Sequence, residues 1–160
     1  MTQPIRNLTT RASLSATASH NVRWFAGMIA GAAALGFSAA NAQEWNGSVS
    51  SNWNEPNNWT PAAVPNNVNA RINILTPNYP VVTSNLLFNP NDIIVGIGAG
   101  SDGRYDQTDG QVNVNSWVYT GVEGGNGVLN LTGNARLIAG GRFYLGGSRN
   151  VVGGTGVAIA

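Results

Sequence analysis

The chain has 160 residues and contains no cysteine, no lysine and only one histidine, and 9% of its residues are charged. Without cysteine it can form no disulfide, so its stability must come from burial and backbone pairing. The histidine, His20, lies in a segment that we expect to be removed. The remaining chain then lacks most nucleophile and base pairs and the usual zinc ligands. We therefore predict neither an enzyme nor a cofactor.

A long hydrophobic run occurs near the start of the chain. The apolar run from Trp24 to Phe37 follows Arg6, Arg11 and Arg23, and Ala40-Asn41-Ala42 has the small-x-small pattern of a signal-peptidase site. This predicts a secretory signal peptide with a signal helix over residues 1–42, cleaved before Gln43. A retained membrane anchor is the alternative, but a spanning helix needs about 20 apolar residues and this run is shorter. We expect no membrane span in the mature chain.

Removing the leader changes the charge balance. Three of the eight arginines lie in the leader and all seven acidic residues lie beyond it, so the mature chain is mildly acidic. It lacks the basic stripe of a nucleic-acid-binding protein. We therefore expect no nucleic-acid partner.

Glycine returns at an even interval in the second half of the chain, at Gly96, Gly121 and Gly146. Each of these glycines closes a short run of strand-forming residues. A fixed period of about 20 to 50 residues indicates stacked repeats that share a core with their neighbours. We predict an all-β fold, a parallel β-helix-like β-solenoid with coils of about 25 residues.

The alternation within each run assigns its side chains to two faces. The inward row should hold Ile93, Val95, Val118, Thr120, Phe143 and Leu145. The interleaved row should face water and holds Asp92, Ile94, Trp117, Tyr119, Arg142 and Tyr144, with Tyr119 and Tyr144 stacked. A second strand row, residues 105–107 and 128–131, repeats at an interval one residue shorter, and residues 112–115 supply a third side. One extra residue between Thr132 and Arg142 has no assigned place.

Three segments follow from this reading. Residues 1–42 are the signal peptide, and residues 43–91 are a cap rich in tryptophan, asparagine and proline with short strands. Residues 92–160 are solenoid repeats, at most three coils. The run Gly156–Ala160 falls inside the strand that corresponds to Gly127–Leu131. We therefore expect the chain to be a truncated portion of a longer protein.

Several motifs together resemble a known family. They are Trp45-x-Gly47, Trp53 and Asn58-Trp59, followed by Tyr105-x-Gln107-Thr108-x-Gly110-x-Val112 and Gly127-x-Leu129-x-Leu131-Thr132-Gly133. The chain resembles exported bacterial proteins of the autotransporter-associated β-strand-repeat type, whose relatives often carry a PEP-CTERM sorting tail. The resemblance implies a β-solenoid on the outer surface of a Gram-negative bacterium or outside the cell. It brings no catalytic residues, and the sorting tail or translocating barrel of such proteins is absent from the sequence given.

Two groups of residues are candidates for binding. Asp102, Asp106 and Asp109 flank Arg104 and could bind Ca²⁺ or supply the acidic pair of a glycosidase or lyase. A solvated turn is the commoner role of such acids, and asparagines are expected at the stacked positions of the next coil. Gly98, Gly100 and Gly103 match G-x-G-x-x-G, but a strand follows them where a nucleotide site needs a helix.

The second group is Trp45, Trp53 and Trp59. These residues could form a flat glycan-binding platform, or they could fill the first coil, since tryptophan buries a large apolar area. Solvent exposure of the indoles separates the two interpretations. Overall, we expect a secreted or surface-displayed structural or adhesive β-solenoid whose partner is an extracellular polysaccharide or matrix. The alternatives are a carbohydrate-binding module and the N-terminal portion of a β-helical polysaccharide lyase.

Overall fold

The structure is a computed structural model that describes residues 42–75, 77–147 and 155–159, the last segment for its backbone alone. The described residues form twelve strands and one short 3-10 helix, with no α-helix among them. The predicted signal helix lies outside the described residues. The elements are β1 Ala42–Trp45, η2 Pro56–Asn58, β2 Trp59–Thr60, β3 Asn69–Ile72, β4 Val81–Val82, β5 Ile93–Ile97, β6 Asp102–Gln107, β7 Gln111–Val114, β8 Val118–Val122, β9 Asn126–Leu131, β10 Arg136–Ala139, β11 Phe143–Leu145 and β12 Thr155–Ile159.

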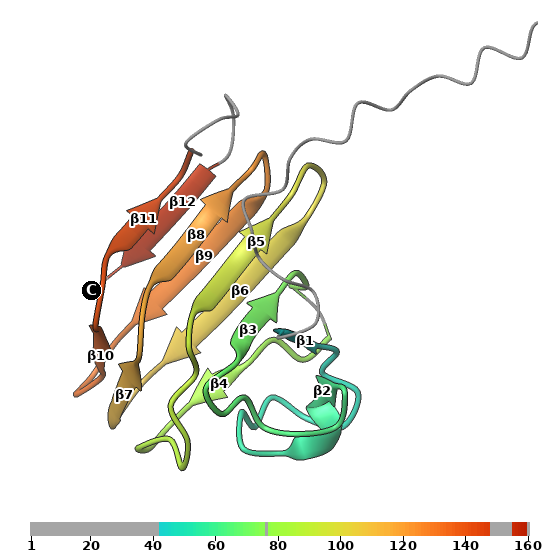
Figure 1. Cartoon of the computed structure of the whole chain (residues 1–160), viewed down its shortest axis with the longest axis vertical. Coiled ribbons are helices and arrows are strands. Elements are labelled where there is room, and N and C mark those ends of the chain that lie inside the picture. The colour runs from blue at the N-terminus through green and yellow to red at the C-terminus, as the bar shows by residue number, and fades with distance from the viewer. Residues whose placement is uncertain (1–41, 76, 148–154, 160) are drawn as a thin grey trace, which may run out of the picture. The chain divides into compact units, whose positions relative to one another are not determined.

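The strands form three sheets around a shared core. Sheet A has the order β11-β8-β5-β3-β1-β2, sheet B the order β12-β9-β6-β4, and sheet C pairs β10 with β7. All pairings are parallel except that of β1 with β2. The chain passes from sheet A to sheet B to sheet C and back, and each circuit stacks on the last (Figure 1). The fold is therefore β-solenoid-like, with about four coils.

The registers agree with the predicted repeat. Ile93 lies opposite Val118, and Val118 lies opposite Phe143, so three successive coils are in step at the interval set by the glycines. In sheet B, Tyr105 lies opposite Leu129, which confirms the interval that is one residue shorter. Backbone pairing also places Gly156 opposite Gly127, as the sequence predicts.

The stack begins earlier than the sequence indicates. β1 and β3 pair in parallel with each other, and β3 pairs with β5, so they continue sheet A below the predicted first coil. Ala42 lies opposite Asn69, and Ala70 lies opposite Ile93. The first of these intervals is longer than that between the glycines and the second is shorter, which hides the coils from a search for a fixed period. The expectation of at most three coils, starting near Asp92, was therefore too low.

The extra residue of the repeat lies in a turn. Residues 108–110 join β6 to β7, whereas residues 132–135, one more, join β9 to β10. Because the turn between β8 and β9 is one residue shorter than that between β5 and β6, the two changes cancel. Arg136 consequently lies opposite Gln111, at the same interval as the pairs that join β5 to β8 and β8 to β11.

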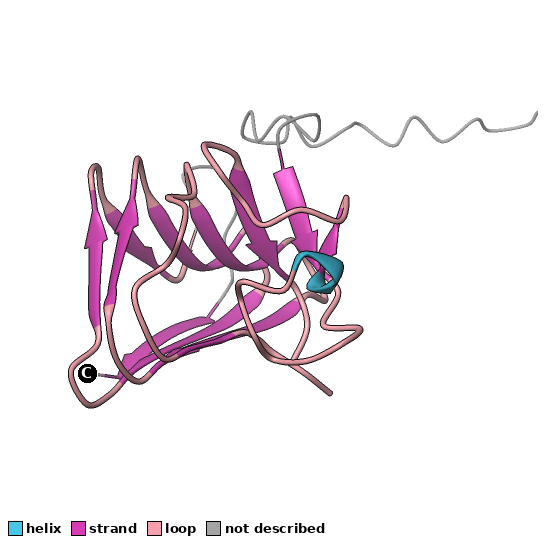
Figure 2. Ribbon diagram, turned by 90° about the horizontal axis from the view of Figure 1, so that it is seen from below, coloured by secondary structure: helices cyan, strands magenta, loops and turns pink. Residues whose placement is uncertain are grey.

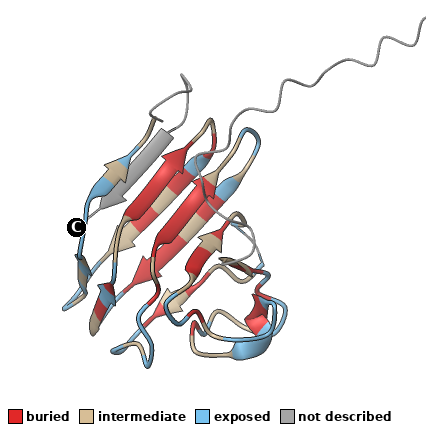
Figure 3. Ribbon diagram, viewed as in Figure 1, coloured by how far each residue is buried: buried red, intermediate tan, exposed pale blue. Residues whose placement is uncertain are grey.

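Side chains from all three sheets meet in one hydrophobic core, and Figure 3 shows burial concentrated in the middle coils. Ile93, Val95, Val118 and Thr120 are fully buried, as predicted. Phe143 and Leu145 occupy the predicted row but are 46% and 50% exposed. The prediction that they are buried was wrong, because β11 is the edge strand of sheet A among the described residues.

The row expected to face water is partly buried, which corrects the second face assignment. Ile94 and Tyr119 form a second buried cluster on the other face of sheet A, with Trp117 and Tyr144 packed against it. Tyr119 and Tyr144 do stack, with ring centroids 5.3 Å apart and planes 8° apart. Asp92 is also buried and accepts a hydrogen bond from the Trp117 backbone N–H. Mutual packing of the aromatic rings removes Ile94 and Tyr119 from water, while Arg142 stays exposed.

Glycine columns form the corner between sheets A and B; Figure 2 shows the strands lying in separate layers that turns connect. Gly96, Gly121 and Gly146 have φ of 69°, 64° and 68°, a region that favours glycine. A Cβ at Gly103 would collide with the backbone of Gly96, and one at Gly127 with the backbone of Gly121. The recurring glycines therefore meet a steric requirement that repeats in successive coils.

Candidate functional site

The three N-terminal tryptophans lie inside the first part of the solenoid. Trp45, Trp53 and Trp59 are each 1% exposed and belong to the main hydrophobic core. The Nε1 of Trp59 donates to the Trp53 carbonyl at 2.9 Å, and the Nε1 of Trp45 donates to the Asn78 carbonyl at 2.6 Å. The segment that connects them is held by Asn58, whose buried amide bonds the backbone at residues 49, 50 and 52.

The indole geometry is that of a packed cluster. Trp59 meets Trp45 and Trp53 edge to face, at centroid distances of 4.9 and 4.8 Å. Trp53 in turn meets the ring of Tyr105 at 5.7 Å and 87°. A glycan platform needs exposed and coplanar rings, and these rings have neither property. The expected glycan-binding platform is therefore not formed by Trp45, Trp53 and Trp59 in this structure, and their packing agrees with the alternative interpretation.

The three candidate calcium ligands are engaged separately. Asp102 accepts a hydrogen bond from the side chain of Asn126, its neighbour in the next coil. Asp106 forms a bidentate ion pair with Arg104, and Asp109 accepts from the Gly110 N–H at 2.7 Å. Among the residues that the structure describes, no group of three or more histidine, cysteine or acidic side chains is placed to hold a metal.

The pKa values of Arg104 and Tyr105 are both raised above their ordinary values. The hydrogen bond to Asp106 is the main reason that the pKa of Arg104 is raised, and the guanidinium also lies over the Tyr79 ring, 4.4 Å from its centroid. Burial raises the pKa of Tyr105, whose hydroxyl donates to the Gln107 Oε1 at 3.1 Å. Both groups therefore have partners inside the fold.

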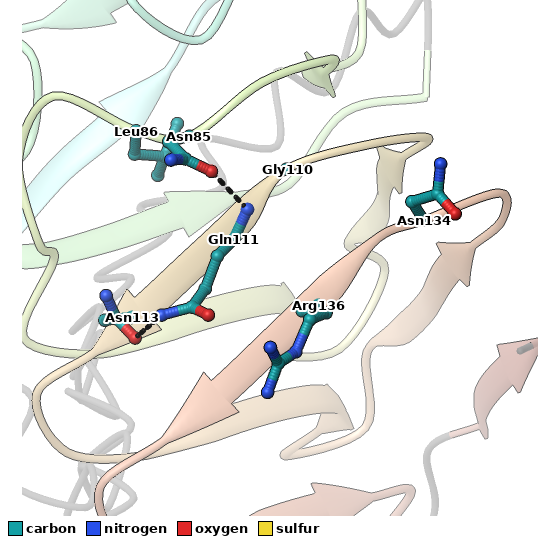
Figure 4. Close-up of a pocket in the computed structure, with 7 residues that line it drawn as sticks. All are labelled: Asn85, Leu86, Gly110, Gln111, Asn113, Asn134 and Arg136. Carbon is teal, nitrogen blue, oxygen red and sulfur yellow. Dashed lines mark hydrogen bonds between the residues drawn. The ribbon is translucent and has the colours of Figure 1, made fainter.

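A polar groove on the outer face of sheet C is the strongest candidate for a binding site. It has a volume of about 460 Å³ and is lined by Asn85, Leu86, Gly110, Gln111, Asn113, Asn134 and Arg136 (Figure 4). β7 supplies Gln111 and Asn113, and β10 supplies Arg136. Within β7 the alternate residues Val112 and Val114 are buried, so the alternation points the polar side chains outward.

The groove is fixed to the core by hydrogen bonds. The buried amide Nε2 of Gln107 donates to the carbonyls of Gly110, at 2.8 Å, and Arg136, at 3.3 Å. The side of the groove formed by Asn85 is also fixed, because the Asn85 Oδ1 accepts a hydrogen bond from the Gln111 N–H at 2.7 Å. Gly110 has φ of 75°, and a Cβ there would collide with the backbone of Ser84 and Asn85. The shape of the groove is thus set by hydrogen bonds and close packing within the coil.

The groove was not predicted from the sequence. The alternating run 112–115 identified an outward-facing strand, but Arg136 could not be aligned with Gln111 while the extra residue had no place. Asn85 reaches the groove from a loop that belongs to the preceding coil. Had the turn 132–135 been recognised as the longer one, the interval of the glycines would have paired Arg136 with Gln111.

A comparison with known proteins finds no matching protein-family model, no matching curated protein and no matching solved structure. Over the residues that the structure describes, no helix has the length and apolar character needed to cross a membrane.

Proposed function

We propose that this chain is a secreted or cell-surface β-solenoid with a structural or adhesive role and no catalytic activity of its own. The observation that carries the proposal is the parallel stack of coils, which repeats side chains in register over a dry core. Solenoids of this kind present extended surfaces to their partners. The partner that we propose is an extracellular polysaccharide or matrix.

Export rests on the leader and on the resemblance to autotransporter-associated and PEP-CTERM-type proteins of Gram-negative bacteria. The proposed cleavage before Gln43 is compatible with the coil, because β1 begins at Ala42 and loses one residue at that bond. Gln43–Trp45 would remain paired with β2 and β3. We further propose that the tryptophan-rich segment is the cap that closes the N-terminal end of the core.

The lyase alternative is less well supported by the coil. A β-helical lyase requires acids that accumulate at stacked positions, whereas Asp102 and Asp106 lie opposite Asn126 and Asn130. Arg104, the nearby base, is held by Asp106 in an ion pair of 2.8 Å. Carbohydrate binding without catalysis remains compatible with the polar groove.

Expression of the full chain with a C-terminal tag in a Gram-negative host tests the proposal. We expect mass spectrometry to find a new N-terminus at Gln43, and cell fractionation to find the tag in the periplasmic extract or the medium. An Ala40→Glu variant should block processing. The processed protein should also sediment with purified extracellular matrix. Retention of the unprocessed chain in the cytoplasm, or no sedimentation with matrix, would overturn the proposal.

A further inference from the structure

The groove on sheet C contains an arginine that no side chain of the described residues neutralises. Arg136 is exposed, and the salt bridge that the described chain contains joins Arg104 to Asp106 and does not involve Arg136. The nearest turn carries Asp109, but its carboxylate is directed to the Gly110 N–H. The groove therefore offers a free guanidinium, which binds carboxylate or sulfate groups through two parallel hydrogen bonds.

Side-chain amides lie next to this guanidinium along the neighbouring strand β7. The Gln111 Nε2 donates to the Asn113 Oδ1 at 3.0 Å, which orients both amides. That bond leaves the Gln111 Oε1 and the Asn113 Nδ2 available to a ligand. Figure 4 shows Gln111, Asn113 and Arg136 side by side on the same face. Paired donors and acceptors at about 5 to 7 Å spacing, the distances between strands and between alternate residues, suit the hydroxyls of consecutive sugars.

The lining also indicates that the ligand must bring charge. Leu86 is the apolar side chain among the seven lining residues, and no aromatic ring is among them. A neutral glycan relies largely on stacking against aromatic faces, and this groove supplies none. Hydrogen bonds exposed to water contribute little unless one partner is charged. The binding free energy must then come largely from Arg136 and an anionic group.

A nucleic acid is a poorer match for the same site. Duplex DNA carries one charge per about 1.7 Å and is held by many cations, and single strands bind through aromatic stacking. The chain beyond residue 42 has five arginines against seven acids, and the groove has one arginine and no ring. A polymer with one acid per sugar requires fewer cations.

We propose that the groove between Asn85 and Arg136 binds an acidic polysaccharide, with Arg136 holding a carboxylate or sulfate and the amides of Gln111 and Asn113 holding neighbouring hydroxyls. This inference rests on the proposed adhesive role and names its ligand class. Gln107 acts as a positioning residue, because it fixes the backbone of Gly110 and Arg136.

The test is an NMR titration of the full chain with hexagalacturonate, using its fully methyl-esterified form as the uncharged match. We expect the acid form to shift the side-chain signals of Gln111, Asn113 and Arg136 and the ester to leave them in place. Arg136→Gln should weaken binding by about three- to tenfold. Arg142→Gln removes the same charge from an exposed position outside the groove and should leave binding unchanged.

Four results would overturn the inference. They are the absence of binding, equal binding of the ester, equal loss in both arginine variants, and tighter binding of a single-stranded DNA hexamer. The matrix sedimentation assay separates this failure from failure of the adhesive role. If Arg136→Gln still sediments with matrix as the wild type does, the adhesive role stands and the groove is not its site.

Discussion

The substitution Gly127→Ala tests whether the glycine columns set the corner between sheets A and B. A Cβ at Gly127 would collide with the Val95 carbonyl oxygen, the Gly121 amide nitrogen and the Cγ2 of Thr120. Two of these are backbone atoms of strands fixed by ladder hydrogen bonds, and Thr120 is fully buried. None of the three can turn away, because the core is close-packed.

We expect this overpacking to lower the free energy of unfolding by about 3 kcal/mol, at the upper end of such changes. Gly100→Ala is the matched control. Gly100 has φ of 81°, but a Cβ there would meet nothing within 4 Å, so the control isolates backbone strain of about 1 kcal/mol. Gly127 has no positive φ, so its loss comes from the collision, and it should exceed the loss of the control by about 2 kcal/mol.

Equilibrium unfolding in urea provides the assay. The three buried indoles of the N-terminal coil should change their fluorescence on unfolding, and an unchanged slope with urea would show that the variant alters stability alone. A loss below about 1 kcal/mol for Gly127→Ala, or a loss no larger than that of Gly100→Ala, would refute the steric argument for the repeat.

Three further predictions concern the core and its charges. Trp59→Ala should lower the free energy of unfolding by about 3 to 5 kcal/mol in urea, while Leu87→Ala, at a 74% exposed side chain, should change it by less than about 0.5 kcal/mol; similar losses would contradict the buried cluster. Because burial raises the pKa of Tyr105, its contribution to stability is complete below about pH 10 and is lost as pH rises further. Urea titrations from about pH 9 to 11 should show this fall, and a Tyr105→Phe variant with the same fall would count against it. Asp106→Asn should cost less than about 1 kcal/mol in thermal melts, since its partner Arg104 is 36% exposed; a larger loss would mean that the pair is less screened than its exposure indicates.

Much of the coil could be predicted from the sequence because its constraints are local and periodic. Three evenly spaced glycines predicted the register of Ile93, Val118 and Phe143. Strand alternation identified the core-facing side chains of β5 and β8. The aromatic stack of Tyr119 and Tyr144 followed from the same register. These features depend on position within one repeat, which the sequence displays directly.

The remaining features depend on contacts between coils of unequal length. Because unequal intervals separate β1, β3 and β5, the first two strands were assigned to the cap, although they continue sheet A. Ile94 was assigned to water because charged residues share its row, yet aromatic packing buries it. Predicting the groove would have required two facts: that the turn 132–135 holds the extra residue, and that Asn85 lies beside Gln111 although it belongs to a distant loop. No single window of sequence contains that information.

The paired glycines at the corner also define where the solenoid can accept foreign peptide. The chain between the two members of a pair differs in length among Gly96 and Gly103, Gly121 and Gly127, and Gly146 and Gly156. Even so, the last residue of each pair falls in the same sheet B register. The loop between the two glycines of a pair can therefore change in length without shifting the register of the strands in sheet B. A peptide grafted after Gly124 would be displayed at the corner while the strands on either side kept their partners, which makes this position an attachment point for engineering a display scaffold.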